Sequence, residues 1–164
     1  LPASALLIAA MNPCPCGRGS GDNASCDCQS NEIRRYRRKI SGPIADRIAI
    51  HLELGYEIND SIENGTKNIS WIEAKSTVAR VKKWVDNNPG EEKFVNGPPL
   101  TEEAAELLNS CRSVLKLSHR GMYHVHDVAI TAALIDDSPL IEVKHIAEAG
   151  ASRLFDRQSW MNPR

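Results

Sequence analysis

The sequence contains no G-x-x-x-x-G-K-[ST] motif, the loop with which P-loop proteins hold the phosphates of a nucleotide. Aromatic residues make up only 5% of the chain, which argues against a large platform for stacking bases. The formal net charge of -1 excludes a global electrostatic field that would draw the protein to nucleic acid or to a membrane. Any recognition of phosphate must therefore be local.

Long apolar runs are missing as well. Residues 1–11 are apolar, but they are shorter than the ~20 residues that cross a bilayer, and they lack the basic start of a signal peptide. We therefore expect no membrane partner. The chain begins with Leu1, and we interpret the apolar start as a buried strand whose upstream partners lie outside the sequence, so we expect a fragment of a longer protein.

Four of the five cysteines form two close pairs, Cys14-x-Cys16 and Cys26-x-Cys28. The loop between the pairs is rich in Gly, Ser, Asp and Asn and has little apolar area to hold it together. Four thiolates on a structural Zn²⁺ would fix such a loop and leave no open position for catalysis. Free thiols or a disulfide pair are the alternatives, although clustered cysteines suit a metal site in a reducing, cytoplasmic compartment better than a disulfide frame.

The apolar stretch over residues 5–11 predicts a central parallel strand with both faces covered. Pro13 ends this strand because proline cannot donate to a sheet ladder. Asn12 would then stand at the carboxyl end of the strand, where open α/β sheets bind ligands. The same residue also fits a simple turn before proline.

A basic segment and a presented arginine follow the cysteines. Residues 33–39 predict a helix that forms a solvated face, contacts DNA phosphates or lies in a subunit interface, and its basic residues are Arg34, Arg35, Arg37, Arg38 and Lys39. Alternating apolar residues over 48–54 predict a half-buried strand with Arg47 at its entrance. Arg47 in that place reaches a neighbour's phosphate or forms a surface pair with Asp46.

The second half of the sequence predicts a small helical bundle. Ser70-x-x-Glu73 is a capping box, residues 86–99 are expected to be loop, and Thr101 and Ser118 begin two further helices before a last one. The expected helix-period apolar positions are Trp71, Ala74, Val78, Val81, Val85, Ala104, Leu107, Leu108, Cys111, Val114, Leu115, Met122, Val125, Ala129, Ala132, Ala133, Val143, Ile146, Ala147 and Leu154.

Two kinds of polar residue stand out in this half. Arg120 lies in the first turn of the helix after Ser118, where a cation is unfavourable for the helix dipole, so it is either simply exposed or has a functional reason to be there. Four histidines fit no zinc-binding spacing, and we expect them at the surface: His119, His124, His126 and His145.

The order of these motifs resembles the magnesium-chelatase-like branch of the AAA+ ATPases, in particular the YifB/ComM family. The matching segments are A-A-M-N-P-C-P-C-G (9–17), C-x-C (26–28), I-R-R-Y (33–36), K-I-S-G-P (39–43), D-R-I (46–48) and L-x-L-S-x-R (115–120). The sequence departs from the family at Ala45 and Ala49, which replace Leu and Asp, and at His119, which replaces Ala.

The resemblance implies a mostly α protein with a small α/β part. Residues 1–55 would be the C-terminal end of an AAA+ core with its last parallel strands and a four-cysteine loop, 56–69 a linker, and 70–164 a helical lid. It assigns Asn12 as sensor 1, Arg47 as an arginine finger acting in trans and Arg120 as sensor 2 near the γ-phosphate of ATP with Mg²⁺.

The resemblance also implies a ring, expected to be a hexamer, that performs ATP-driven work on DNA of the helicase or branch-migration type. Because the phosphate loop is absent from these residues, the chain alone is expected not to hydrolyse ATP. Two alternatives remain, a zinc-stabilised module that binds nucleic acid without chemistry and a true magnesium chelatase subunit.

Overall fold

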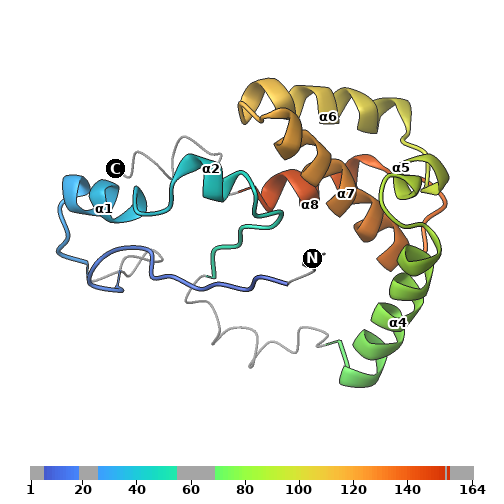
Figure 1. Cartoon of the computed structure of the whole chain (residues 1–164), viewed down its shortest axis with the longest axis horizontal. Helices are drawn as coiled ribbons and strands as arrows, with labels where there is room; N and C mark the ends of the chain where they lie inside the picture. Colours follow the sequence, from blue (N-terminus) through green and yellow to red (C-terminus); the bar gives the residue numbers. More distant parts are fainter. Residues whose placement is uncertain (1–5, 19–25, 55–68, 154, 156–164) are drawn as a thin grey trace, which may run out of the picture.

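The computed structural model describes residues 6–18, 26–54, 69–153 and 155. The helices in this part are α1 (Ser30–Arg37), α2 (Gly42–Ala45), α4 (Trp71–Asn87), α5 (Glu92–Asn96), α6 (Glu102–Val114), α7 (His119–Ile135) and α8 (Val143–Ala151). Figure 1 shows α1 and α2 at one end of the molecule and α4 to α7 at the other, with α8 between them in this view. The mostly α-helical character predicted from the sequence is confirmed.

Neither predicted strand forms in the described part of the chain. Residues 6–11 carry no regular structure, and Leu6 and Ile8 are 87% and 84% exposed. The strand predicted over 48–54 is reduced to one isolated parallel bridge between His51 and Arg153. Both predictions were wrong for these residues because a strand needs neighbours for its backbone N–H and C=O groups, and alternation in a sequence does not supply them.

The helix starts in residues 70–153 follow the predicted caps. The Ser70 hydroxyl accepts a hydrogen bond from the Glu73 N–H at 3.1 Å, and the Glu73 carboxylate accepts one from the Ser70 N–H at 3.0 Å. Thr101 and Ser118 cap α6 and α7 by accepting from the backbone N–H three residues further on. These bonds satisfy donors that the first turn of a helix leaves without a partner, so the boundaries are fixed locally.

The core of the helical part lies where α7 and α8 pack together and α6 covers them. Its buried members are Ala104, Leu117, Val125, Ala129, Ile130, Ala133, Ile141, Ile146 and Ala149. Of the predicted inward positions on α7, Val125, Ala129 and Ala133 are buried and Met122 and Ala132 are half-buried. Val114 on α6 was expected in the core but is 76% exposed. On α4, Trp71 and Val78 are exposed and Trp84 packs against the core instead, so the helical spacing was right but the buried face was partly misjudged.

Two further expectations concern the connections. The loop predicted over 86–99 contains the short helix α5, which continues from the Pro89-Gly90 turn. Most of the predicted linker, residues 56–68, lies outside the described residues, so the division of the chain at this point stays a prediction. Among the helices described, none combines the length and apolarity needed to cross a bilayer.

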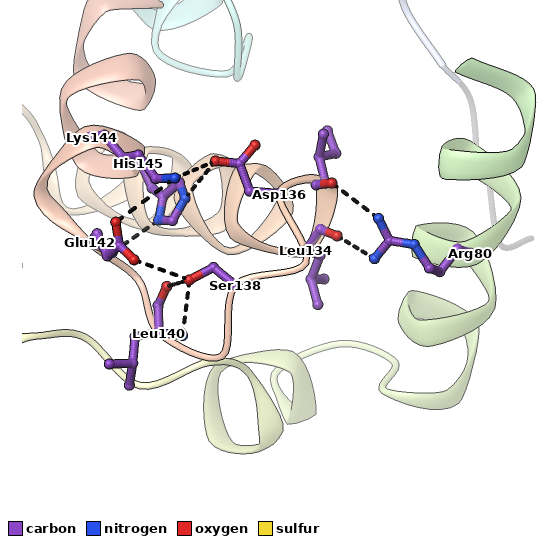
Figure 2. A network of polar contacts seen from close by, with 9 residues as sticks. Arg80, Leu134, Asp136, Ser138, Leu140, Glu142, Lys144 and His145 are labelled. Atoms are coloured by element: carbon purple, nitrogen blue, oxygen red, sulfur yellow. Dashed lines mark hydrogen bonds and ion pairs between the residues drawn. The ribbon is translucent and has the colours of Figure 1, made fainter. Parts of the chain in front are cut away.

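Arg80 joins α4 to the end of α7, as Figure 2 shows. Its guanidinium donates to the Leu134 carbonyl at 2.6 Å and to the Ile135 carbonyl at 3.0 Å, and it pairs with the Asp137 carboxylate at 3.1 Å. The last carbonyls of a helix lack intrahelical partners and carry partial negative charge, which a cation satisfies. Arg80 therefore anchors the exposed helix α4 to the core.

Candidate functional site

The four clustered cysteines come together in space. The Sγ atom of Cys14 lies 3.3 Å from that of Cys16 and 3.5 Å from that of Cys26, and the Cys16–Cys26 separation is also 3.5 Å. All four sulfur atoms, including that of Cys28, lie within 4.8 Å of one another. Zn–S bonds of ~2.3 Å in a tetrahedron place sulfur atoms ~3.8 Å apart. The group can therefore hold a metal such as zinc.

Because these thiols lie so close together, their pKa values differ from one another. Burial raises the pKa of Cys14, but hydrogen bonds with Cys16, Cys26 and two backbone amides outweigh it and lower the pKa to about 6. At Cys28 a backbone hydrogen bond lowers the pKa, yet the crowded thiols, Cys16 first, raise it to about 12. Thiols this close do not all ionise without a cation among them, and an all-sulfur donor set suits zinc. With four protein ligands the site is closed, as in structural zinc sites.

A glycine turn and a buried arginine hold the cysteine loop in place. Gly17 has φ +78, a left-handed conformation that favours glycine, and its N–H donates to the Cys14 carbonyl at 3.1 Å. The Asn12 side chain lies beside this turn, since a Cβ at Gly17 would stand 3.3 Å from the Asn12 Nδ2. Arg37 of α1 is buried and donates from Nε to the Pro13 carbonyl at 3.1 Å.

The basic helix α1 thus has two faces. Arg37 faces the cysteine loop, and its burial lowers the pKa of the guanidinium while Glu53 and Cys14 oppose that shift. Arg35, Arg38 and Lys39 are exposed, and Arg34 and Tyr36 are half-buried. Of the five basic side chains, Arg37 is therefore not part of a solvated face, because it is buried and donates to the Pro13 carbonyl.

Arg47 lies in the turn directly after α2. It is exposed, and one of its terminal N–H groups donates to the Pro43 carbonyl at 2.6 Å. Asp46, which the sequence offered as an ion-pair partner for Arg47, accepts a hydrogen bond from the Ser118 hydroxyl at 2.5 Å instead. Because Ser118 caps α7, this carboxylate also stands at the positive end of that helix, where it is favoured.

Arg120 is exposed in the first turn of α7. The bond between Asp46 and Ser118 lies one residue from Arg47 and two residues from Arg120, so it brings the two arginine-bearing segments to one junction. Burial lowers the pKa of His124, one turn into α7, and Arg153 and Arg120 lower it further while Asp127 and then Asp46 oppose them. Asn12, the third residue of the predicted nucleotide site, lies beside the Gly17 turn of the cysteine loop.

The histidines differ from the expectation that all four are at the surface. His119 is exposed, but His145 is 1% exposed. Its Nδ1 accepts from the Glu142 N–H at 2.9 Å, so the proton is on Nε2, which donates to the Asp136 carboxylate at 3.2 Å. His145 therefore fastens the start of α8 to the end of α7. No histidine joins a metal-type cluster within the described part of the chain.

Two residues that the sequence reading missed are His51 and Arg153. Arg153 is 0% exposed, and His51 is 3% exposed. Each contacts a segment about a hundred positions away in the sequence, so no local sequence pattern predicts that either residue is buried. The only available signal was an arginine that follows the small-residue end of α8, A-G-A-S-R, which does not identify a partner.

Comparisons with known proteins add the following. Residues 1–61 match the family model described as magnesium chelatase, subunit ChlI. Over 95% of its length, the chain is 30% identical to the uncharacterized protein YifB of Escherichia coli and 28% identical to the competence protein ComM of Haemophilus influenzae, and it spans 32% of each relative. An uncharacterized protein of Mycobacterium tuberculosis is 40% identical over 53 residues, 32% of this chain and 10% of that protein. No solved structure matches the chain significantly.

Proposed function

Because the chain is a homologue of YifB and ComM with the magnesium chelatase ChlI family domain in residues 1–61, we propose that it is part of an AAA+ motor that hydrolyses ATP. In this proposal the phosphate-binding loop comes from residues outside the chain. Arg47 is the arginine finger for a neighbouring subunit, Arg120 is sensor 2, and Asn12 is sensor 1. The motor assembles as a ring, proposed to be a hexamer.

The observation that carries the proposal is the hydrogen bond between Asp46 and Ser118. It joins two segments 72 positions apart, and each presents an exposed arginine within two residues of the bond. Phosphoryl transfer needs cations that neutralise charge on the transferred group, and in this proposal Arg120 serves the nucleotide of its own subunit while Arg47 serves that of the neighbouring subunit. An arginine finger contributes ~10³–10⁵ in rate where it has been measured.

The cysteine cluster and α1 support a role on DNA. We propose that the cluster holds a structural Zn²⁺, which fixes the loop against which Arg37 packs. The exposed side chains of Arg35, Arg38 and Lys39 then form a basic edge beside the metal, suited to phosphate contacts. One relative is the competence protein ComM, and we propose that the motor works on DNA in the manner of a helicase or branch-migration enzyme.

The test uses the intact protein, with the variants Arg47→Ala and Arg112→Ala. Arg112 is an exposed arginine at the last turn of α6 and serves as the matched control. We expect Arg47→Ala to lower kcat by ~10³ or more while the binding of a fluorescent ATP analogue is unchanged, because a finger acts on the transition state. Nucleotide binding that disappears together with turnover would give Arg47 another role. ATP turnover by the pure isolated chain would overturn the proposal that the phosphate-binding loop lies outside it.

A second candidate is a zinc-stabilised module that binds nucleic acid without chemistry. The observation that favours it is that Arg37 is buried against the cysteine loop while Arg35 on α1 and the residues just after it, Arg38 and Lys39, are exposed. This module would bind DNA with an affinity that falls steeply with salt, and the intact protein would show no ATP turnover. A P-loop encoded upstream of Leu1 favours the motor, and a start codon close to Leu1 favours the module.

A further inference from the structure

The segment that carries Arg47 is held by the end of α8. A terminal N–H group of Arg153 donates to the Ile48 carbonyl at 2.6 Å and to the Ala49 carbonyl at 3.3 Å. In the adjacent pair, the His51 N–H donates to the Ser152 carbonyl at 2.6 Å. Burying a guanidinium is costly, and these two carbonyls accept from one of its terminal nitrogens, so the contact favours one position of the segment against the helix.

His51 closes the other side of the same contact. Its ring stacks on Phe155 with centroids 4.3 Å apart, and its Nδ1 accepts from the Phe155 N–H at 3.4 Å. The proton is therefore on Nε2, which donates to the Ala45 carbonyl at 3.1 Å. The His51 side chain thus bridges the end of α2 and the residues after α8, and the turn with Arg47 lies within this bridge.

A second tie fixes the turn from the direction of α7. The Asp46 carboxylate accepts the Ser118 hydroxyl while the Ser118 oxygen accepts the Gly121 N–H at 3.0 Å. Arg47 is therefore flanked on one side by a bond to α7 and on the other by the Arg153 bonds. Because α7 and α8 share a buried core that includes Ile146 and Ala149, both ties lead to the same packed unit.

We infer that Arg153 is a positioning residue for Arg47, and that the buried Arg153 contact, with the Asp46–Ser118 bond, couples the orientation of the helical part to the reach of the finger. The inference rests on the proposed function of Arg47. When Arg120 binds a nucleotide, the start of α7 shifts toward that nucleotide. Because α8 is packed against α7 and the Arg47 turn is bonded to both, α8 and the turn shift as well. Occupancy of one subunit's site would thereby set the geometry of the finger that the same subunit offers to its neighbour.

The first experiment measures backbone hydrogen exchange in the intact protein and its variants Arg153→Met, Arg153→Lys and Arg112→Met. Methionine keeps the length of the side chain but cannot donate to a carbonyl, whereas lysine still can. We expect at least tenfold faster exchange of peptides covering residues 45–52 in Arg153→Met, partial recovery in Arg153→Lys and no change in the exposed control Arg112→Met. Unchanged exchange in Arg153→Met would overturn the inference.

The second experiment measures ATP turnover in the same variants and in Arg47→Ala. Misplacing a reacting group by about 1 Å costs up to ~10²-fold in rate, so we expect kcat of Arg153→Met to fall at least tenfold while the dissociation constant of ATP stays within twofold. Loss of nucleotide binding in Arg153→Met would mean a general structural role and would overturn the inference. Recovery of kcat in Arg153→Lys supports positioning.

The variant Asp46→Ala keeps the inference testable if Arg153→Met does not fold. It removes the tie to α7 but leaves Ser118 as the cap and Arg153 in place. We expect it to lower kcat in the same direction, by less than Arg153→Met. If Arg47→Ala abolishes turnover but both Arg153→Met and Asp46→Ala turn over normally, the inference alone fails. If Arg47→Ala also turns over normally, the proposed function fails with it.

Discussion

Replacing Cys14 by serine tests the metal site most sharply. Cys14 is the most buried of the four cysteines, 1% exposed, and its sulfur lies 3.3 Å and 3.5 Å from those of Cys16 and Cys26. Serine keeps the size of the side chain but offers no thiolate. Structural zinc in small peptides binds with ~10–16 kcal/mol, so one of four equivalent ligands contributes ~3 kcal/mol. Its loss should weaken zinc binding by roughly 100-fold.

The assay is zinc content by mass spectrometry after purification under reducing conditions, followed by competition with a chromogenic chelator. We expect one zinc per wild-type chain and a roughly 100-fold weaker site in Cys14→Ser. Cys111→Ser is the matched control, because Cys111 lies on α6 outside the cluster, packed toward Gly150 of α8. Wild-type protein free of zinc, or Cys14→Ser with unchanged affinity, would refute the reasoning.

Metal removal should also have a local structural signature. The bond from Arg37 to the Pro13 carbonyl ties α1 to the cysteine loop, whereas α7 and α8 pack in a separate core. We therefore expect chelation to speed hydrogen exchange in Ser30–Arg37 and to leave exchange in α7 unchanged. Equal loosening of both regions would mean that the cysteine loop supports the whole chain.

Three further predictions concern the helical part. Arg80→Ala removes two hydrogen bonds to helix-end carbonyls, so the free energy of unfolding in urea should fall by about 1 kcal/mol, whereas Asp137→Asn, which removes only the charge of the exposed ion pair, should cost less than half of that. Ile146→Ala empties a fully buried site and should cost about 3 kcal/mol by the same measurement, against less than about 1 kcal/mol for Val143→Ala, whose side chain is half exposed. Hydrogen bonds from Lys144, and then from His145, lower the pKa of Asp136, so the stability that Asp136 provides is complete above its unfolded pKa of about 4 and is lost as the pH falls through its lower folded pKa. Thermal unfolding of Asp136→Asn between about pH 2 and 4 should accordingly vary less with pH than that of the wild type, and equal slopes would contradict the assignment.

The sequence was sufficient for features with a local cause. Three helices are capped by a side-chain oxygen that accepts from the backbone N–H three residues further on, at Ser70, Thr101 and Ser118. This spacing can be recognised in the sequence alone. The cysteine cluster was predictable for a similar reason, since two C-x-C pairs around a polar loop have few other ways to be stabilised. The resemblance to YifB and ComM came from long motifs, and the comparisons find the same relatives along 95% of the chain and the magnesium chelatase family domain in residues 1–61.

Features with a distant cause were missed or misjudged. Alternating residues over 48–54 have the pattern of a strand, but they form only one isolated bridge, between His51 and Arg153. In that bridge the His51 N–H donates to the Ser152 carbonyl. His145 was expected at the surface because the spacing of the histidines fits no zinc site, but it is buried, and its ring accepts from the Glu142 N–H and donates to the Asp136 carboxylate. In these cases the deciding contact lies elsewhere in the chain, where periodicity and propensity carry no information.

The most direct test of the central claim mixes two inactive forms of the intact protein, Arg47→Ala and a variant disabled in the phosphate-binding loop. If Arg47 serves the neighbouring subunit, mixed rings contain sites where an intact loop faces an intact finger. The account predicts ATP turnover in the mixture well above the sum of the two separate forms. A mixture as inactive as its components, or an Arg47→Ala protein with wild-type turnover by itself, would contradict it.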